Sequence, residues 1–256
     1  MGKPYLKIAI APFLKSCPRL ITLGVRGSLA DYSHEEMRLM AAADRIFFPT
    51  PRFAKVLEAA GKETFPNTFT YSLRKSSLLQ AAFFEFHGCP HPRSRIYFGR
   101  QKALIPSDFR YPFQAMGPET RNRARTIEDA EQLAEVVEKF NPLIVRENVL
   151  FEERFRLMFL NLECVAVLRD VSGDLSCPGP SASLSLYGWG LERFLSHVVG
   201  LVRSYKLNDI AVEIGFSRDR GWQLASLSRP PLSWQSPDGP VNRHEYIAAL
   251  IMAGDL

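Results

Sequence analysis

The chain has 256 residues, of which 46% are apolar, so it can fold around a sizeable core and is not expected to be disordered. No run of about 18 apolar residues occurs, which excludes a transmembrane helix, and the short apolar stretch after Lys7 lacks a signal-peptide pattern. We therefore expect a cytoplasmic protein without a membrane partner. The formal charge of +5 suits an anionic partner, a nucleotide or a nucleic acid, although a solvated basic surface is the simpler explanation.

Apolar and amphipathic segments alternate through the first quarter of the chain. Pro51 stands in the first turn of one expected helix and Gly61 at its end, which are favoured positions for these residue types. The expected order is strand, helix, strand, helix and strand, at residues 7–11, 34–43, 45–48, 51–60 and 64–65. This order predicts a parallel sheet with helices on its faces.

The rest of the chain mixes helices and strands less regularly. We expect a helix over 72–86 with Lys75 in its first turn, and a helix over 126–140 that begins at a capping box of Thr126 and Asp129. Residues 153–170 alternate as a hairpin that turns near Asn161. Further strands are expected at 95–98, 112–115, 143–145, 209–215 and 222–227, further helices at 191–205 and 243–252, and a loop over 171–185.

Several short motifs occur in the order typical of one known superfamily. They are, in sequence, Lys75 at a helix start, the turn of Gly88, Pro90 and Pro92, apolar strands ending at Met116 and Glu147, Arg156, Arg169, and the strands at 209–213 and 223–227. In this order the chain resembles the ATP-grasp superfamily, of the glutathione synthetase and ribosomal-protein glutamate ligase type. The resemblance covers nearly the whole chain.

The resemblance implies an α/β architecture of the α+β grasp kind in three parts. Residues 1–65 correspond to an N-terminal α/β pre-grasp domain, residues 66–142 to a helix plus the ATP-grasp lid, and residues 143–256 to the C-terminal ATP-grasp subdomain. We expect one cleft between the lid and the C-terminal sheet. Its expected lining is Lys75, Arg156, Arg169 and Glu213, bordered by Met116, Ala225 and Leu227.

Enzymes of this superfamily make an acyl phosphate from a carboxylate and ATP, which an amine or thiol then attacks. The resemblance implies ATP as the candidate ligand. It implies nucleotide binding by Lys75, Glu147, Arg156 and Arg169, and a weak metal ligand in Glu213.

Other superfamily positions have lost their chemistry. The second phosphate-binding lysine corresponds to Met116, and the two ligands of the Glu–x–Asn motif correspond to Ala225 and Leu227. Magnesium prefers hard oxygen ligands, so these apolar side chains argue against magnesium. Arginines replace the glycine-rich loop that covers the phosphates, and we regard Arg121, Arg123 and Arg125 as a candidate anion-binding loop.

Three functions remain open from the sequence. The first is a non-catalytic ATP-grasp-fold protein with a weakened nucleotide or anion site. The second is an active ATP-dependent carboxylate–amine ligase in which Glu213 and another carboxylate, such as Glu163, hold one magnesium ion. The third is a nucleic-acid-binding protein that uses the basic loop. The sequence identifies no protein partner.

Overall fold

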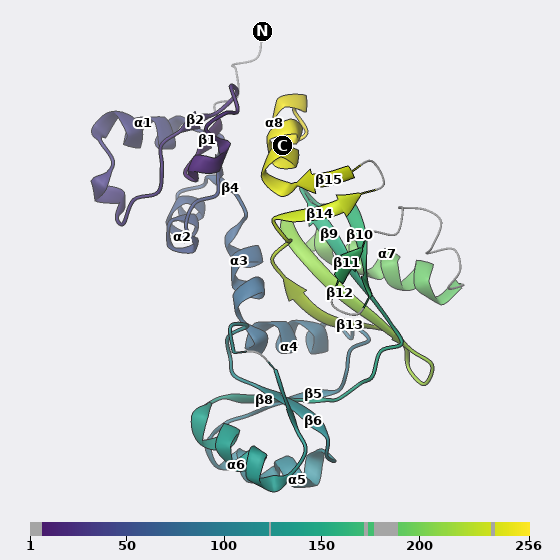
Figure 1. Ribbon diagram of the computed structural model, residues 1–256. Coiled ribbons are helices and arrows are strands. Elements are labelled where there is room, and N and C mark those ends of the chain that lie inside the picture. Colours follow the sequence, from purple (N-terminus) through teal and green to yellow (C-terminus); the bar gives the residue numbers. More distant parts are fainter. Residues whose placement is uncertain (1–6, 123, 172–173, 177–188, 237–238) are drawn as a thin grey trace.

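The computed structural model describes residues 7–122, 124–171, 174–176, 189–236 and 239–256, and it has three larger sheets and one small hairpin (Figure 1). The N-terminal sheet is parallel, in the order β2 (Ile21–Thr22), β1 (Lys7–Ala9), β3 (Arg45–Phe47) and β4 (Glu63–Phe65). Its helices are η1 (Pro12–Leu14), η2 (Leu29–Asp31), α1 (His34–Ala42) and α2 (Pro51–Ala59). The side chains of Ser33 and Thr50 cap α1 and α2, which explains where these helices begin.

Two helices, α3 (Thr68–Lys75) and α4 (Ser77–Phe86), replace the single helix expected over 72–86. Ser76 between them is extended, at φ −123° and ψ 105°, and its hydroxyl accepts the N–H of Leu79 at 3.0 Å. A serine that bonds the backbone in this way starts a new helix. Lys75 therefore lies in the last turn of α3, and the expectation that it opens a helix was wrong.

The middle part of the chain forms an antiparallel sheet, which we call the lid sheet. Its order is β5 (Ser94–Tyr97), β8 (Leu143–Glu147), β6 (Phe113–Met116) and β7 (Arg125–Ile127), with η3 (Gly99–Leu104), α5 (Ile105–Asp108) and α6 (Ala130–Lys139) beside it. Asp129 caps α6 and Thr126 lies in β7, so the predicted capping box was misplaced. The strand β8 follows the boundary expected at residue 142, yet it pairs within the lid sheet.

The C-terminal sheet is antiparallel, in the order β11 (Asp174–Ser176), β10 (Glu163–Val171), β9 (Glu153–Leu160), β12 (Asp209–Ser217) and β13 (Gly221–Ser228). Helix α7 (Trp189–Ser204) covers one face, where it shares a core with Phe155, Val212 and Leu224 (Figure 1). The hairpin of β14 (Ser233–Ser236) and β15 (Gly239–Asn242) follows, and α8 (Arg243–Ala253) ends the chain's regular structure. Within the described residues, no helix is long and apolar enough to cross a membrane.

Two β-bulges decide which side chains reach which face of the C-terminal sheet. Val165 is left between two successive pairs of β10 with β9, and Ala225 lies between the β13 partners of Glu213 and Ile214. Side chains alternate between the two faces of a strand, so one extra residue moves those that follow to the opposite face. The bulge at Val165 lies between Arg156 and Arg169 in the sequence, and the bulge at Ala225 lies between Glu213 and Leu227. The sequence analysis placed all four of these residues at the expected cleft.

Candidate functional site

A cavity of about 470 Å³ lies between the lid sheet, α4 and the strand β13. Its apolar walls come from Met116 and Ile144 on the lid sheet and from Leu224 on β13. Ala225 and Leu227, which we expected at the border of the cleft together with Met116, line it as well. The volume lies within the range of about 300–1,000 Å³ that is usual for small-molecule sites.

A buried glutamine fixes the wall that α4 contributes to this cavity. The Gln80 side chain is 6% exposed, and its amide nitrogen donates to the carbonyl oxygens of Leu73 and Leu227, both at 2.7 Å. Its amide oxygen accepts the N–H of Leu227 at 3.0 Å. Because Gln80 satisfies both backbone groups of Leu227, it holds α4 against β13 in one register.

The acidic group of the cavity already has partners. Glu213 on β12 lies opposite Arg156 on β9 and opposite Ser226 on β13. One carboxylate oxygen accepts Nη2 and Nε of Arg156 at 2.7 and 3.1 Å, and the other accepts the Ser226 hydroxyl at 2.7 Å. The side chains of Arg156 and Glu213 are 26% and 32% exposed, and Glu213 is the member of the pair that lines the cavity.

The residues around Glu213 do not fit a magnesium site. The bulge at Ala225 places Ser226 and Ser228 on the same face as Glu213, instead of the expected Ala225 and Leu227. Among the described residues that line the cavity, Glu213 is the one acidic side chain, and the described part of the chain holds no group of three His, Cys, Asp or Glu residues arranged for a metal. Magnesium binding in proteins relies on carboxylates, and a guanidinium and a hydroxyl already use this one.

The second carboxylate considered for magnesium lies elsewhere. Glu163 is at the other end of the β9–β10 hairpin and pairs with Arg203 at 2.8 Å. Arg156, the partner of Glu213, lies opposite Leu168, five residues further along β10. Five residues of extended strand span about 16 Å. Glu163 and Glu213 therefore cannot share one ion in this arrangement.

Two arginines beside the cavity form no ion pair with a carboxylate among the described residues. The guanidinium of Arg146 on β8 donates to the side-chain oxygen of Gln114, at 2.6 and 3.2 Å, and to the carbonyl of Ala225 at 2.7 Å. Burial, and then the charge of Arg154, lower the pKa of Arg146, while Glu213 raises it. Neutral acceptors thus orient a positive charge that lines the cavity.

The second such arginine is Arg154, which lies on β9 two residues before Arg156. It lines a smaller cavity of about 90 Å³ that shares Arg146 and Glu213 with the larger one. Its guanidinium lies 5.4 Å from the centre of the Phe151 ring. That ring packs on Gly215, where a Cβ would come within 2.3 Å of it, so only glycine fits there.

Two expected nucleotide-binding residues lie beside the cavities and are engaged in other contacts. Lys75 is exposed and does not line the larger cavity, but its carbonyl accepts the N–H of Thr120, which does. Glu147 lines the smaller cavity and forms an ion pair with Arg220.

Arg169 lies on the other face of the C-terminal sheet. The bulge at Val165 places it opposite Phe155, on the α7 side, whereas Leu168 lies opposite Arg156. Its guanidinium binds both carboxylate oxygens of Glu153, at 2.5 and 2.9 Å. The prediction that Lys75, Arg156, Arg169 and Glu213 line one cleft was therefore wrong for Arg169 and for Lys75. Glu213 lines both described cavities, and Arg156 pairs with it without lining either.

The expected arginine loop directs its described arginines to its own neighbours. Arg121 pairs with Glu119 at 2.5 Å, and Arg125 pairs with Glu135; Arg123 lies outside the described residues. Uncharged residues of this loop line the cavity instead, namely Thr120, Asn122 and Ala124. These contacts do not favour the nucleic-acid hypothesis.

Arg146 and Arg154 were missed as site residues by the sequence reasoning, although a signal was present. Arg146, Arg154 and Arg156 lie within eleven residues of the sequence, and only Arg156 matched a superfamily position. Their convergence depends on pairing between β9 and β12 and on the approach of β8, which residue spacing does not reveal.

No protein-family model matches the sequence, and a search of the curated proteins finds no match. Solved structures do match. A RimK-domain ATP-grasp protein from Sphaerobacter thermophilus aligns with a TM-score of 0.63 and 13% identity over 88% of this chain and 90% of its own. N5-carboxyaminoimidazole ribonucleotide synthetase from Thermotoga maritima gives a TM-score of 0.64 and 12% identity, over 89% of this chain and 69% of its own.

A carboxyaminoimidazole ribonucleotide synthase from Aspergillus clavatus, in complex with ATP, gives a TM-score of 0.58 and 13% identity over 88% of this chain and 70% of its own. The chain has the ATP-grasp fold. At these identities the likeness establishes the fold alone.

Proposed function

We infer that this chain is a non-catalytic ATP-grasp-fold protein that binds a nucleotide or another anionic ligand in the cavity between the lid sheet and β13, without magnesium. One observation carries the inference. Arg146 and Arg154 present charges without carboxylate partners among the described residues, while the carboxylate of Glu213 is already held by Arg156 and Ser226. Such a site attracts anions and lacks ligands for a metal.

The shape of the cavity supports a ligand with an apolar body and an anionic end. Met116, Ile144 and Leu224 provide the apolar surface against which a planar base packs well. Arg146 stands at the junction of the two cavities, and guanidinium groups bind phosphate in bidentate geometry. A nucleotide meets both requirements, and two structural neighbours are described as complexes with ADP and with ATP.

Catalysis makes demands that these residues do not meet. Phosphoryl transfer depends on cations placed around the transferred group, and losing one such contact costs about 10²–10³ in rate. Here the lysine position is Met116, and the face beside Glu213 carries hydroxyls of Ser226 and Ser228. We therefore expect no measurable magnesium-dependent ATP turnover.

Calorimetric titration with ATP, with and without magnesium, tests the proposal. Arg146→Gln and Arg154→Gln are each expected to weaken ATP binding by about tenfold or more, because each removes a charge-assisted contact. Arg218→Gln is the matched control, since Arg218 is 84% exposed in the turn after β12 and pairs with Glu152. Equal losses of ATP affinity in all three variants would show a general charge effect and refute the assigned site.

The alternative is an active ATP-dependent carboxylate–amine ligase with a rearranged site. Glu213 lines the cavity and is a carboxylate at a metal-ligand position implied by the resemblance, and several structural neighbours are described as ligases or synthetases. A phosphate-release assay distinguishes the two proposals. Turnover that needs magnesium and disappears in Glu213→Gln would favour the ligase.

A further inference from the structure

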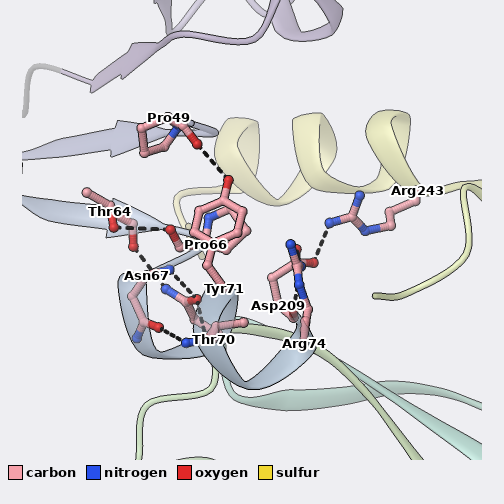
Figure 2. Close-up of polar contacts among 10 residues, drawn as sticks. Pro49, Thr64, Pro66, Asn67, Thr70, Tyr71, Arg74, Asp209 and Arg243 are labelled. Atoms are coloured by element: carbon pink, nitrogen blue, oxygen red, sulfur yellow. Dashed lines mark hydrogen bonds and ion pairs between the residues drawn. The ribbon is translucent and has the colours of Figure 1, made fainter. Parts of the chain in front are cut away.

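A second cluster of arginines lies away from the cavity, where α3, β12 and α8 meet the N-terminal sheet. Asp209 is completely buried at the start of β12. One of its carboxylate oxygens accepts Nη1 of Arg74 at 2.5 Å, and the other accepts Nη2 of Arg243, as Figure 2 shows. We call Arg74, Asp209, Arg229 and Arg243 the Asp209 cluster.

The donors of Arg243 are only partly satisfied. Arg243 is 1% exposed, and its Nε and Nη1 groups have no hydrogen-bond partner among the described residues. Its guanidinium lies 5.6 Å from the centre of the Phe48 ring, which offers no lone pair as an acceptor. Buried N–H groups of a charged side chain are costly to leave unpaired, so this geometry calls for an acceptor that the described residues do not supply.

The cluster also has more positive than negative charge. Arg229 follows β13, and part of the residue reaches solvent. Its pKa is lowered first by the burial of the remainder and then by the charges of Arg243 and Arg74. Asp209, followed by Tyr71, opposes this shift. Two guanidinium groups thus bind the one carboxylate of the cluster, and the charge of a third, Arg229, adds to theirs.

A second buried nitrogen without a partner belongs to the residue that follows Arg243. His244 follows Arg243 in the first turn of α8, and its ring stacks on Phe13 with centroids 3.7 Å apart. Its Nε2 is buried and has no partner among the described residues. The two unpaired N–H groups of Arg243 suit an acceptor with several oxygens, because a guanidinium binds such a group through more than one hydrogen bond.

We propose that the Asp209 cluster binds a compact oxyanion, a phosphate or carboxylate group, between Arg243 and Arg229. The anion enters from the side of Arg229, since Arg229 is exposed while Arg243 is buried. This site goes beyond the proposed function because it is separate from the cavity. Ser228 nevertheless lines that cavity and immediately precedes Arg229, so the two sites adjoin.

Titration calorimetry with inorganic phosphate, and separately with acetate, tests the proposal on the full chain. Ionic strength is held constant with chloride. Saturable binding is expected, and Arg229→Gln is expected to weaken it by about tenfold or more because one charge-assisted contact is lost. Tighter binding of phosphate than of acetate would assign the group as a phosphate, and the reverse order as a carboxylate.

Three further variants make the experiment decisive. Arg38→Gln changes an exposed arginine of α1 and is expected to bind phosphate as the unmodified chain does. Arg146→Gln removes a charge from the cavity, and it is expected to weaken ATP binding while leaving phosphate binding intact. Arg243→Lys keeps the charge but loses the forked donors, and is expected to weaken binding in a chain whose folding is checked by circular dichroism.

Several results would overturn the proposal. An absence of saturable binding to the unmodified chain would mean that water, and no anion, fills the place beside Arg243. Equal losses of phosphate affinity in Arg229→Gln and Arg38→Gln would show that phosphate is attracted only by the overall positive charge of the chain. Loss of phosphate binding in Arg146→Gln alone would place the anion in the cavity, and would leave the proposed function standing without a second site.

Discussion

Two arginine–carboxylate clusters in this molecule have the same chemistry in very different surroundings. At the cavity, Arg156 and Glu213 are 26% and 32% exposed. In the Asp209 cluster, Asp209 is 0% exposed and its partners Arg243 and Arg74 are 1% and 9% exposed. The first pair lies within one sheet, whereas the second connects α3, β12 and α8 (Figure 2).

The difference in burial separates a replaceable contact from a structural one. An ion pair that water reaches contributes about 0–1 kcal/mol to stability, so a ligand can take over one of its partners at little cost. A buried carboxylate between two guanidinium groups cannot be removed without leaving buried charges unpaired. Glu213 can therefore exchange partners when a ligand binds, while Asp209 holds three elements in place.

The largest expected effect breaks the buried cluster. Asp209→Asn is expected to lower the free energy of unfolding by about 3–5 kcal/mol, because Arg74 and Arg243 lose the charge that compensates them. Denaturant unfolding measures this change. Glu213→Gln is the matched comparison, and a loss above about 1 kcal/mol is not expected there. Equal losses in the two variants would contradict the distinction.

A smaller effect is expected where α4 meets β13. Gln80→Ala leaves the N–H and C=O groups of Leu227 without their side-chain partner, and each buried group left unpaired costs about 1–3 kcal/mol. Denaturant unfolding is again the measurement, and ATP binding should weaken as well because this contact shapes the cavity. Gln235→Ala is the control, since Gln235 is exposed in β14. An unchanged free energy of unfolding in Gln80→Ala would refute the role of this contact.

The pH dependence of stability gives a more modest test of the Asp209 cluster. Burial, followed by the charges of Arg243 and Arg229, lowers the pKa of His244 below 6.5. The unfolded chain therefore takes up a proton on His244 at a higher pH than the folded chain does, so stability falls as the pH drops below about 6.5. The melting temperature should therefore decline between pH 7.5 and pH 5.5, a range that extends about one pH unit to each side of the ordinary histidine pKa.

The variant His244→Gln checks the origin of that decline. Glutamine does not titrate, so the melting temperature should depend less on pH over the same range. An identical decline in the variant would assign the effect to other groups.

The smallest expected effect concerns Arg169. Because this residue lies on the α7 face with Glu153, Arg169→Gln should leave ATP binding unchanged and alter stability by at most about 1 kcal/mol. Calorimetry and denaturant unfolding measure the two quantities. A tenfold weaker ATP affinity would restore Arg169 to the nucleotide site and refute the assignment of faces, since tenfold corresponds to about 1.4 kcal/mol.

The sequence was sufficient for the fold class and for most element positions, because periodic apolar segments and caps depend on nearby residues. The helices 34–43 and 51–60 were expected within one residue of α1 and α2. The ATP-grasp order of strands was also recognisable. Local competition was harder to foresee, as at Ser76, where a hydroxyl cap divides one expected helix into two.

Two of the errors about the site have one physical cause. Without the bulge at Val165, Arg169 would lie opposite Arg154, on the face of Arg156; without the bulge at Ala225, Glu213 would lie opposite Ala225. Each bulge adds one residue and so reverses the face of every side chain beyond it. Neither bulge is marked by glycine or proline, so residue pattern alone predicted the unbroken register.

The binding of ATP with and without magnesium tests the central claim most directly. Calorimetry on the full chain, beside a phosphate-release assay, is expected to show the same affinity in magnesium and in EDTA, no phosphate release, and weaker binding in Arg146→Gln. This result follows if arginines provide the positive charge of the site. Binding that requires magnesium, together with phosphate release that Glu213→Gln abolishes, would contradict the account and establish an active ligase.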